Sequence, residues 1–525
     1  IALVAVFTFT AVNSNAQDFN VDFENSIYNI DMRDLGDINV PKPNTSKIWG
    51  PFEHPQKKDI KEWTIMTFIN GKNNLEIAGL FNVNQMEAIG SDKNMNIVVE
   101  LGRMKGQAGD VDIDGDWTGS RRLYVMKDND EEKVTSPVMM ETKDVDMGDY
   151  KRIVDFVKWT KKNYPAKKYM LVIWNHGTGM FDPAQEKKFA DKGISYDDET
   201  GNYVRTVEIG KILKESGGVD ILDFDACLMQ MAEVAYEVKD YTEVVIGAEE
   251  TFPGYGQPYD IFLGELKKMP DASPENFAAV IVESAKTFYT TVVSKSMTLS
   301  AIRTSKLEGL ANKMSAFADS VKKVNDVGAI SMARNYTLRY DAVGAGSDPE
   351  KTISFFGDIS HFASLMSTNI TKKGADADKL AAASKDLVEF IANDLVVHSV
   401  TVGNDRMGTS LAIGKGISVY LPPAETRITQ DKLESIFEGK YQDFAFAKAS
   451  GWHDFVTFLY NVKAESKCVE PGEGASYRDK LQYRTCKNRE KFELGLTKCF
   501  DPGEDASMDE IVDYAACKTI EELGL

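Results

Sequence analysis

Residues 169–177 read Tyr-Met-Leu-Val-Ile-Trp-Asn-His-Gly, and residues 219–227 read Val-Asp-Ile-Leu-Asp-Phe-Asp-Ala-Cys. The first segment begins with an apolar run and the second with a mainly apolar one, which is typical of buried strands, and each then turns polar. In open α/β sheets, ligands bind outside the carboxyl ends of the strands. We therefore expect His176 and Cys227 to face the same crevice.

Further apolar runs flank these two segments and alternate with helical patterns. Strands are predicted at 63–69, 95–101, 121–126 and 243–247. Helices are predicted at 75–89, 149–164, 207–216 and 229–239. This alternation predicts an α/β fold with a mainly parallel sheet and helices on both faces. Beyond about residue 265 the chain becomes mainly helical, at 274–293, 307–324 and 376–394, before a strand-like segment at 416–422.

The two ends of the chain differ in composition from this central part. Residues 1–12 are apolar but too few to span a bilayer, and Ser14-Asn15-Ala16 supplies small residues before Gln17. This pattern predicts a signal peptide at 1–16 and a secreted protein, extracellular or periplasmic. Residues 17–60 are polar and rich in proline, which predicts an extended arm. No other stretch reaches about eighteen apolar residues, so we expect no membrane span.

Four of the five cysteines lie in a repeat at 463–525, in which Cys499 follows Cys468 by 31 residues. Equal spacing to the second cysteine of each copy, Cys486 and Cys517, predicts the bridges Cys468–Cys486 and Cys499–Cys517. The other two pairings stay open. We expect two small disulfide-stapled units, whose role as an anchor or as a binding site for a surface partner stays open. The fifth cysteine, Cys227, stands alone, and an odd cysteine in a secreted chain is a candidate reactive thiol.

The bulk composition narrows the class of protein. The chain has 525 residues, a hydrophobic content of 43% and a formal net charge of −20. These values indicate a globular protein of more than one structural unit. The negative charge argues against nucleic-acid binding, which relies on clustered Lys and Arg.

The residue types at the two strand ends suit nucleophilic catalysis. A histidine accepts a proton near neutral pH, and a cysteine thiolate is a strong nucleophile. A glycine directly after His176 lets substrate approach the backbone and leaves an N–H for an oxyanion hole. The structural alternative is a buried thiol and a buried imidazole without a catalytic role.

The two blocks resemble those of the clostripain family, within the larger group that holds caspases, legumains and gingipains. The resemblance extends in order over about residues 60–460, through 63–75, 115–122, 247–256, 298–302, 356–362 and 416–422. It implies a caspase-like catalytic core at 61–265 and a C-terminal part of the peptidase at 266–462. The arm and the cysteine repeat lie outside it.

The resemblance implies a role for each site residue. His176 corresponds to the general base, and Cys227 to the nucleophile that forms a thioacyl enzyme. The backbone N–H groups of Gly177 and Cys227 correspond to the oxyanion hole. Asp225, two residues before the nucleophile, corresponds to the group that binds the Arg or Lys side chain of a protein or peptide substrate. Glu249 and Glu250 are secondary candidates for the same pocket.

Family members often activate themselves by cleavage between the His and Cys blocks. Here the polar stretch 181–192 offers basic residues in that interval. An exposed loop of this kind is a preferred site of nicking. The sequence therefore predicts autocleavage after Lys188 or Lys192.

Residues 110–116, Asp-Val-Asp-Ile-Asp-Gly-Asp, resemble the start of a calcium loop. The twelfth position is Arg121, where a complete loop carries a bidentate Glu. We read the segment as an acidic hairpin and predict no metal site. The chemistry requires no cofactor, and calcium stays open as an irregular addition.

The sequence also leaves a rival of a different class. A non-catalytic caspase-like protein could use the Asp225 pocket to bind basic peptides. A hydrolase with another nucleophile has no support, because no Gly-x-Ser-x-Gly or His-Glu-x-x-His segment occurs.

Overall fold

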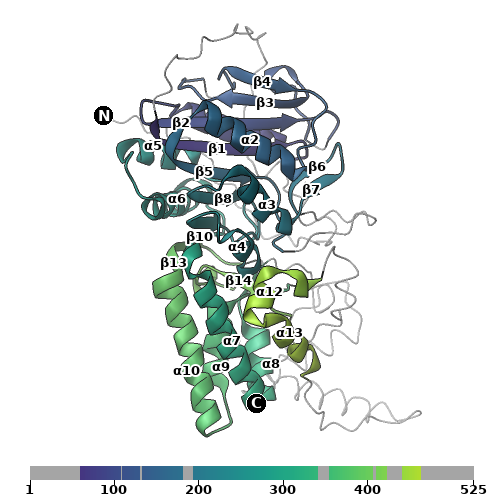
Figure 1. Cartoon of the computed structure of the whole chain (residues 1–525), viewed down its shortest axis with the longest axis vertical. Helices are drawn as coiled ribbons and strands as arrows, with labels where there is room; N and C mark the ends of the chain where they lie inside the picture. The colour runs from purple at the N-terminus through teal and green to yellow at the C-terminus, as the bar shows by residue number, and fades with distance from the viewer. Residues whose placement is uncertain are drawn as a thin grey trace, which may run out of the picture.

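The protein is described by a computed structural model that covers residues 60–107, 109–130, 133–180, 193–340, 354–405, 409–422 and 440–462. Its centre is a nine-stranded sheet with the order β13-β10-β9-β8-β5-β1-β2-β3-β4 (Figure 1). The signal peptide, nearly all of the arm, the stretch 181–192 and the cysteine repeat lie outside the described residues.

The five central strands of the sheet are parallel to one another. They are β9 (Val244–Gly247), β8 (Ile221–Asp225), β5 (Ala166–Trp174), β1 (Lys61–Gly71) and β2 (Met95–Arg103). Most of their residues are buried, which matches the continuous apolar runs in the sequence. The prediction of an α/β fold with helices on both faces of a mainly parallel sheet is confirmed.

Antiparallel strands extend the sheet at both edges, so the sheet is mixed. On the β2 side these are β3 (Gly119–Tyr124) and β4 (Val138–Thr142). On the β9 side they are β10 (Met297–Arg303) and β13 (Val396–Val402). The last two strands follow residue 265 in the sequence, so residues on both sides of that position share one sheet.

Two apolar cores lie on opposite faces of the sheet. Successive strand residues point to alternate faces, so Met170 and Val172 join one core while Leu171 and Ile173 join the other. One face is covered by α1 (Glu76–Glu87), α5 (Tyr259–Lys268) and α6 (Pro274–Phe288). The other is covered by α2 (Tyr150–Asn163), α3 (Thr206–Ser216), α4 (Ala232–Val238) and α7 (Leu307–Val324).

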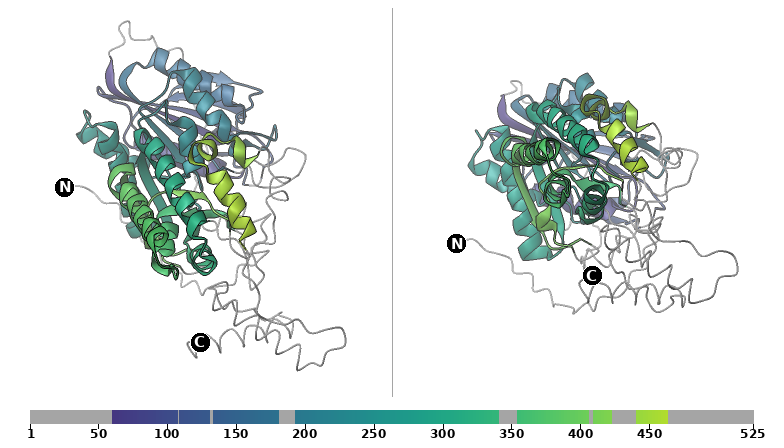
Figure 2. Two further views of the ribbon diagram at one scale, coloured as in Figure 1. Left: turned by 60° about the horizontal axis from the view of Figure 1, so that its bottom comes forward. Right: turned by 90° about the horizontal axis from the view of Figure 1, so that it is seen from below.

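The remaining helices pack beside α7 and continue its core away from the sheet, as Figure 2 shows from two further directions. They are α8 (Val327–Tyr336), α9 (Ile359–Asn369), α10 (Ala375–Phe390), α12 (Ala445–Ser450) and α13 (Trp452–Asn461). A small antiparallel sheet of β11 (Arg339–Tyr340), β12 (Phe356–Asp358) and β14 (Ser418–Tyr420) lies between them and the main sheet. The N–H of Ser418 donates to the carbonyl of Gln230 at 3.0 Å, which ties this small sheet to the segment after β8.

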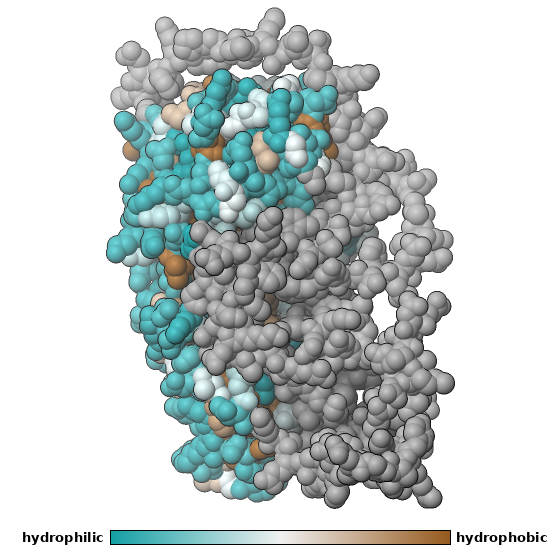
Figure 3. All heavy atoms as spheres, turned by 90° about the vertical axis from the view of Figure 1, so that its right-hand side faces the viewer, coloured by the Kyte–Doolittle hydropathy of each residue, from teal (hydrophilic) through white to brown (hydrophobic). Residues whose placement is uncertain are grey.

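The described surface is mostly hydrophilic on the face shown in Figure 3, with scattered hydrophobic side chains. Such isolated exposed apolar residues are ordinary for a soluble fold. Within the described ranges, no helix is both long and apolar enough to cross a membrane.

Candidate active site

The carboxyl ends of β1, β5 and β8 meet at one edge of the sheet and form one cavity. Parallel pairing places Trp174 of β5 beside Ile69 of β1 and Asp225 of β8. The cavity is small and partly open to solvent. It is lined by Leu75, Trp174, Asn175, His176, Asp225, Ala226, Cys227, Phe252, Pro253, Gly254 and Gly256. His176, Cys227 and Asp225, which the sequence singled out, are therefore brought together.

Cys227 lies in the turn that follows β8 and is half-buried. The backbone N–H of Phe252 donates to its Sγ atom at 3.1 Å. The thiol in turn donates to the carbonyl oxygen of Phe252 at 3.7 Å, so the backbone of Phe252 fixes the position of the sulfur. The next residue, Leu228, has a φ of +63°, an uncommon backbone conformation for a side chain of this size. The chain therefore changes direction sharply directly after Cys227.

His176 follows β5 by two residues and is 6% exposed. Its Nε2 atom lies 2.7 Å from Oδ1 of Asn74, which belongs to the turn between β1 and α1. The adjacent Gly177 packs tightly on the cysteine turn, because a Cβ there would lie 2.4 Å from the carbonyl oxygen of Cys227. A side chain at position 177 would therefore separate the two backbones.

Asp225 is the last residue of β8 and is 4% exposed. Its Oδ2 atom accepts hydrogen bonds from the N–H of Gln257 at 3.0 Å and from the hydroxyl of Tyr259 at 2.9 Å. Burial raises the pKa of this carboxyl from 3.8 to about 6 in spite of these two donors. Asp225 therefore presents a poorly solvated carboxylate to the cavity at neutral pH.

A second carboxyl group, that of Asp223, lies deeper on the same face of β8. Its Oδ1 atom accepts a hydrogen bond from Nε2 of Gln257 at 2.8 Å. Complete burial, with the nearby charge of Asp225, holds its pKa well above 3.8. Burial therefore disfavours the charged form of Asp223. Asp223 does not line the cavity.

Glu249 and Glu250, the secondary candidates, lie outside the cavity lining. Both are buried, and both of their backbone N–H groups donate to Oγ1 of Thr298 on β10, at 3.0 and 3.1 Å. Burial raises the pKa of Glu249 to about 8, so it is largely protonated near neutral pH. These contacts direct this segment toward β10.

The acidic loop before β3 is held by contacts within the protein. The carboxylate of Asp110 accepts the N–H of Gly106 at 2.7 Å, and Asp116 pairs with Lys105 at 2.7 Å. In the part of the chain that the structure describes, no group of three or more His, Cys, Asp or Glu side chains is arranged to hold a metal ion. Lys188, Lys192, Cys468, Cys486, Cys499 and Cys517 lie outside the described residues.

The sequence did not predict the four residues that form hydrogen bonds with the three predicted side chains: Asn74, Phe252, Gln257 and Tyr259. The blocks at 63–75 and 247–256, which contain Asn74 and Phe252, gave a signal through their resemblance to the clostripain family, but that signal named no partner. Asn74 lies more than 100 positions from His176. Only the pairing of β1 with β5 brings the two together.

Comparison with known proteins identifies the family. A family model described as the clostripain family matches residues 67–459. Clostripain of Hathewaya histolytica is 28% identical over 222 residues, which cover 39% of this chain and 42% of that protein. The chain therefore spans less than half the length of this curated relative.

Solved structures share the fold at lower identity. One is a secreted C11 cysteine protease from Bacteroides thetaiotaomicron in complex with an irreversible peptide inhibitor, with a TM-score of 0.53 and 20% identity, covering 75% of this chain and 99% of its own. Another is an inactive zymogen C11 protease from Parabacteroides distasonis, with a TM-score of 0.53 and 18% identity over the same shares. At these identities the likeness is one of fold.

Proposed function

This chain belongs to the clostripain family, and we propose that it is a secreted cysteine endopeptidase that cleaves peptide bonds after Arg or Lys. The observation that carries the proposal is the meeting of His176, Cys227 and Asp225 in one cavity at the carboxyl ends of β5 and β8. A base, a nucleophile and a buried carboxylate are the three groups that this reaction needs.

In the proposed reaction the Cys227 thiol transfers its proton to His176, and the thiolate attacks the carbonyl carbon of the scissile bond. The amine product leaves with the proton that His176 returns, and the acyl group stays on sulfur as a thioester. Water, deprotonated by the same imidazole, then releases the acid product and the free thiol. Contacts with the N–H and the carbonyl of Phe252 hold the sulfur in position at the start of this sequence.

The backbone N–H groups of Gly177 and Cys227 are the proposed donors to the oxyanion. Close contact of these two backbones supports this assignment, since a Cβ at position 177 would meet the carbonyl of Cys227. Two such donors stabilise the negative oxygen that develops in both tetrahedral intermediates.

Asp225 is the proposed ligand of the substrate's basic side chain. The apolar cavity residues Leu75, Trp174 and Phe252 suit the aliphatic stem of Arg or Lys, and the carboxylate suits its charged end. In the described residues Asp225 forms no ion pair, and both groups that donate to its carboxylate are neutral. Its charge is therefore left to be neutralised by a cationic ligand.

The proposal includes activation by self-cleavage after Lys188 or Lys192, because a basic residue there would satisfy the same pocket. Secretion is supported by the apolar segment and small residues at 1–16, and a structural relative is described as secreted. The new amino terminus would be Phe189 or Gly193. Sequencing the nicked chain distinguishes the two.

The test compares wild type with Cys227→Ala on paired fluorogenic peptides, one ending in Arg or Lys and the other in Asp. We expect cleavage of the basic peptides only, and loss of both this cleavage and the internal nick in the variant. Turnover that survives in Cys227→Ala overturns the mechanism. Binding of the basic peptides without turnover by the reduced wild type, with or without calcium, would indicate the non-catalytic rival.

A further inference from the structure

The histidine of the site has a partner that the proposed dyad does not include. Asn74 places its Oδ1 atom 2.7 Å from Nε2 of His176. We propose that Asn74 is a positioning residue that holds His176 as the Nε2–H tautomer, so that Nδ1 is the nitrogen that accepts the Cys227 proton. This inference rests on the proposed function and adds a third member to its catalytic group.

The chemistry of the contact fixes which ring nitrogen is basic. An amide oxygen accepts hydrogen bonds and cannot donate one, so Nε2 must carry the hydrogen. A neutral imidazole carries one N–H, which leaves the lone pair on Nδ1. When Nδ1 takes the proton of Cys227, His176 becomes cationic and its bond to Asn74 becomes charge-assisted and stronger. The contact therefore favours the thiolate–imidazolium pair over the neutral pair.

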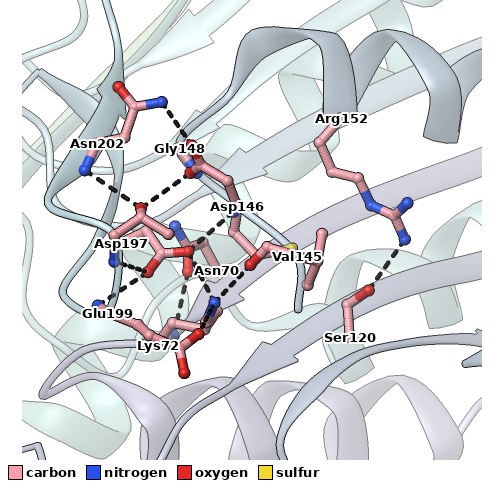
Figure 4. A network of polar contacts seen from close by, with 12 residues as sticks. Asn70, Lys72, Ser120, Val145, Asp146, Gly148, Arg152, Asp197, Glu199 and Asn202 are labelled. Atoms are coloured by element: carbon pink, nitrogen blue, oxygen red, sulfur yellow. Dashed lines mark hydrogen bonds and ion pairs between the residues drawn. The ribbon is translucent and has the colours of Figure 1, made fainter. Parts of the chain in front are cut away.

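A positioning residue must itself be held, and Asn74 sits in a firmly anchored turn. Lys72, two residues earlier, is completely buried. Its Nζ atom lies 3.1 Å from Oδ2 of Asp197 on β6 (Ile194–Asp197) and donates to the carbonyl of Val145 at 2.5 Å. It also pairs with Glu199, and Figure 4 shows the lysine enclosed by these oxygens. The charge of Lys72 is thus satisfied inside the protein.

The same network reaches the segment that carries His176. Asn175, its neighbour in the chain, donates from Nδ2 to the carbonyl of Asn70 at 2.6 Å and accepts the N–H of Tyr196 at 3.0 Å. Asn73, the neighbour of Asn74, donates to the carbonyl of Tyr196 at 2.9 Å. The residues adjacent to both members of the contact are therefore fixed to one strand. This leaves little freedom in the distance between Asn74 and His176.

The other titratable groups of the cavity must be separated from this effect. They are Cys227 and Asp225, which line the same cavity as His176. Near the turn of Asn74, Lys72 forms ion pairs with both Asp197 and Glu199. Asp225 ionises near pH 6, so an experiment on pH dependence needs Asp225→Asn as a parallel background.

The experiment measures the rate at which iodoacetamide alkylates Cys227 in the full chain as a function of pH, alongside kcat and KM for an Arg peptide. The variants are Asn74→Ala, Asn74→Asp, His176→Ala and the exposed control Asn276→Ala, with the first two repeated in Asp225→Asn. Iodoacetamide is neutral and small, so its reaction reports the ionisation of the thiol without the substrate pocket. Thermal melts confirm that each variant is folded.

For Asn74→Ala we expect the acid limb of the alkylation profile to move to higher pH. We also expect kcat to fall by about 10- to 100-fold, with KM nearly unchanged, as for loss of a hydrogen bond to a charged group. Asn74→Asp should restore most of kcat and move the limb below that of wild type, because a carboxylate stabilises the imidazolium more than an amide does. Asn276→Ala should match wild type.

Two outcomes overturn the inference without touching the proposed function. One is an unchanged alkylation profile in Asn74→Ala while His176→Ala shifts it. The other is an Asn74→Asp variant that resembles Asn74→Ala in kcat and profile, since a merely structural asparagine would show no such rescue. If Asn74→Ala does not fold, the acid limb of the Asn74→Asp alkylation profile tests the inference alone: a limb that is not below that of wild type overturns it. An unchanged profile in His176→Ala would instead refute the His–Cys pair.

Discussion

Replacing Asp225 with Asn should remove cleavage after basic residues and, at the same time, make the protein more stable at neutral pH. The carboxyl is almost completely buried, and within the described residues its hydrogen-bond donors are the neutral groups of Gln257 and Tyr259. An asparagine amide oxygen can accept both of these hydrogen bonds. The substitution therefore removes the buried charge and keeps the hydrogen bonds.

The size of the gain follows from the pKa of the carboxyl. Burial raises this pKa from 3.8 to about 6, so the folded protein binds the proton more tightly than the unfolded chain does. Wild-type stability therefore falls as the pH rises from about 4 to about 6, and it is level above that range. At about 1.36 kcal/mol per pKa unit, the ionised carboxylate costs about 3 kcal/mol of unfolding free energy. This value is an upper bound for the gain in Asp225→Asn.

The assay is urea unfolding of wild type and variant at two pH values. At pH 7.5 the variant should be more stable by up to about 3 kcal/mol, and at pH 5 by about half as much, because wild type is then mostly protonated when folded. Turnover of an Arg peptide should fall by at least about 100-fold, since the guanidinium loses a charge-assisted partner.

A matched control is Asp223→Asn, which removes a buried carboxyl on the same strand and face but outside the cavity. It should keep wild-type specificity and turnover within a few-fold. The reasoning fails if Asp225→Asn gains no stability at pH 7.5, or if its gain is the same at both pH values. It also fails if the variant still cleaves after Arg at the wild-type rate.

Two further substitutions test the frame of the site. Gly177→Ala places a Cβ 2.4 Å from the carbonyl oxygen of Cys227, so the two proposed oxyanion donors should move apart. We expect kcat to fall by about 100-fold or more. A near-normal kcat would exclude Gly177 as an oxyanion donor. Lys72→Met leaves the buried carboxylate of Asp197 without its cation and should lower the unfolding free energy by about 3–5 kcal/mol in denaturant titrations, whereas a loss below about 1 kcal/mol would contradict a buried pair.

The sequence predicted the strands that are buried on both faces and the residues at their ends. A central parallel strand such as β5 leaves a continuous apolar run, and the polar residues that follow it mark the edge where ligands bind. For this reason His176 and Cys227 could be named together, and the resemblance to the clostripain family added Asp225. Their proximity follows from two pairings, β1 with β5 and β5 with β8.

Other features could not be predicted because their patterns are weak or non-local. Strand β4 is short and largely exposed, and β13 is only partly buried at the opposite edge, so neither leaves a continuous apolar run. The secondary candidates Glu249 and Glu250 follow β9 but do not line the cavity, and Thr298 on β10 accepts hydrogen bonds from both of their backbone N–H groups. Strand β10 joins the sheet only after two intervening helices. The local sequence around Glu249 and Glu250 therefore gives no sign of their contact with Thr298.

Two buried charged residues, Lys72 and Asp225, differ in how their charge is neutralised, and this difference separates a structural role from a functional one. Lys72 is enclosed by Asp197 and Glu199, so its charge is neutralised inside the protein and nothing further is required for binding. Asp225 is held in place by neutral donors only, which fix its position but leave its negative charge to be matched from the cavity. A cation that enters the cavity offsets much of the free energy that the Asp225 carboxylate loses on burial, because two opposite charges attract strongly where water is scarce. The buried charge of Asp225 lowers the free energy of unfolding, and part of this loss is recovered when a basic side chain binds.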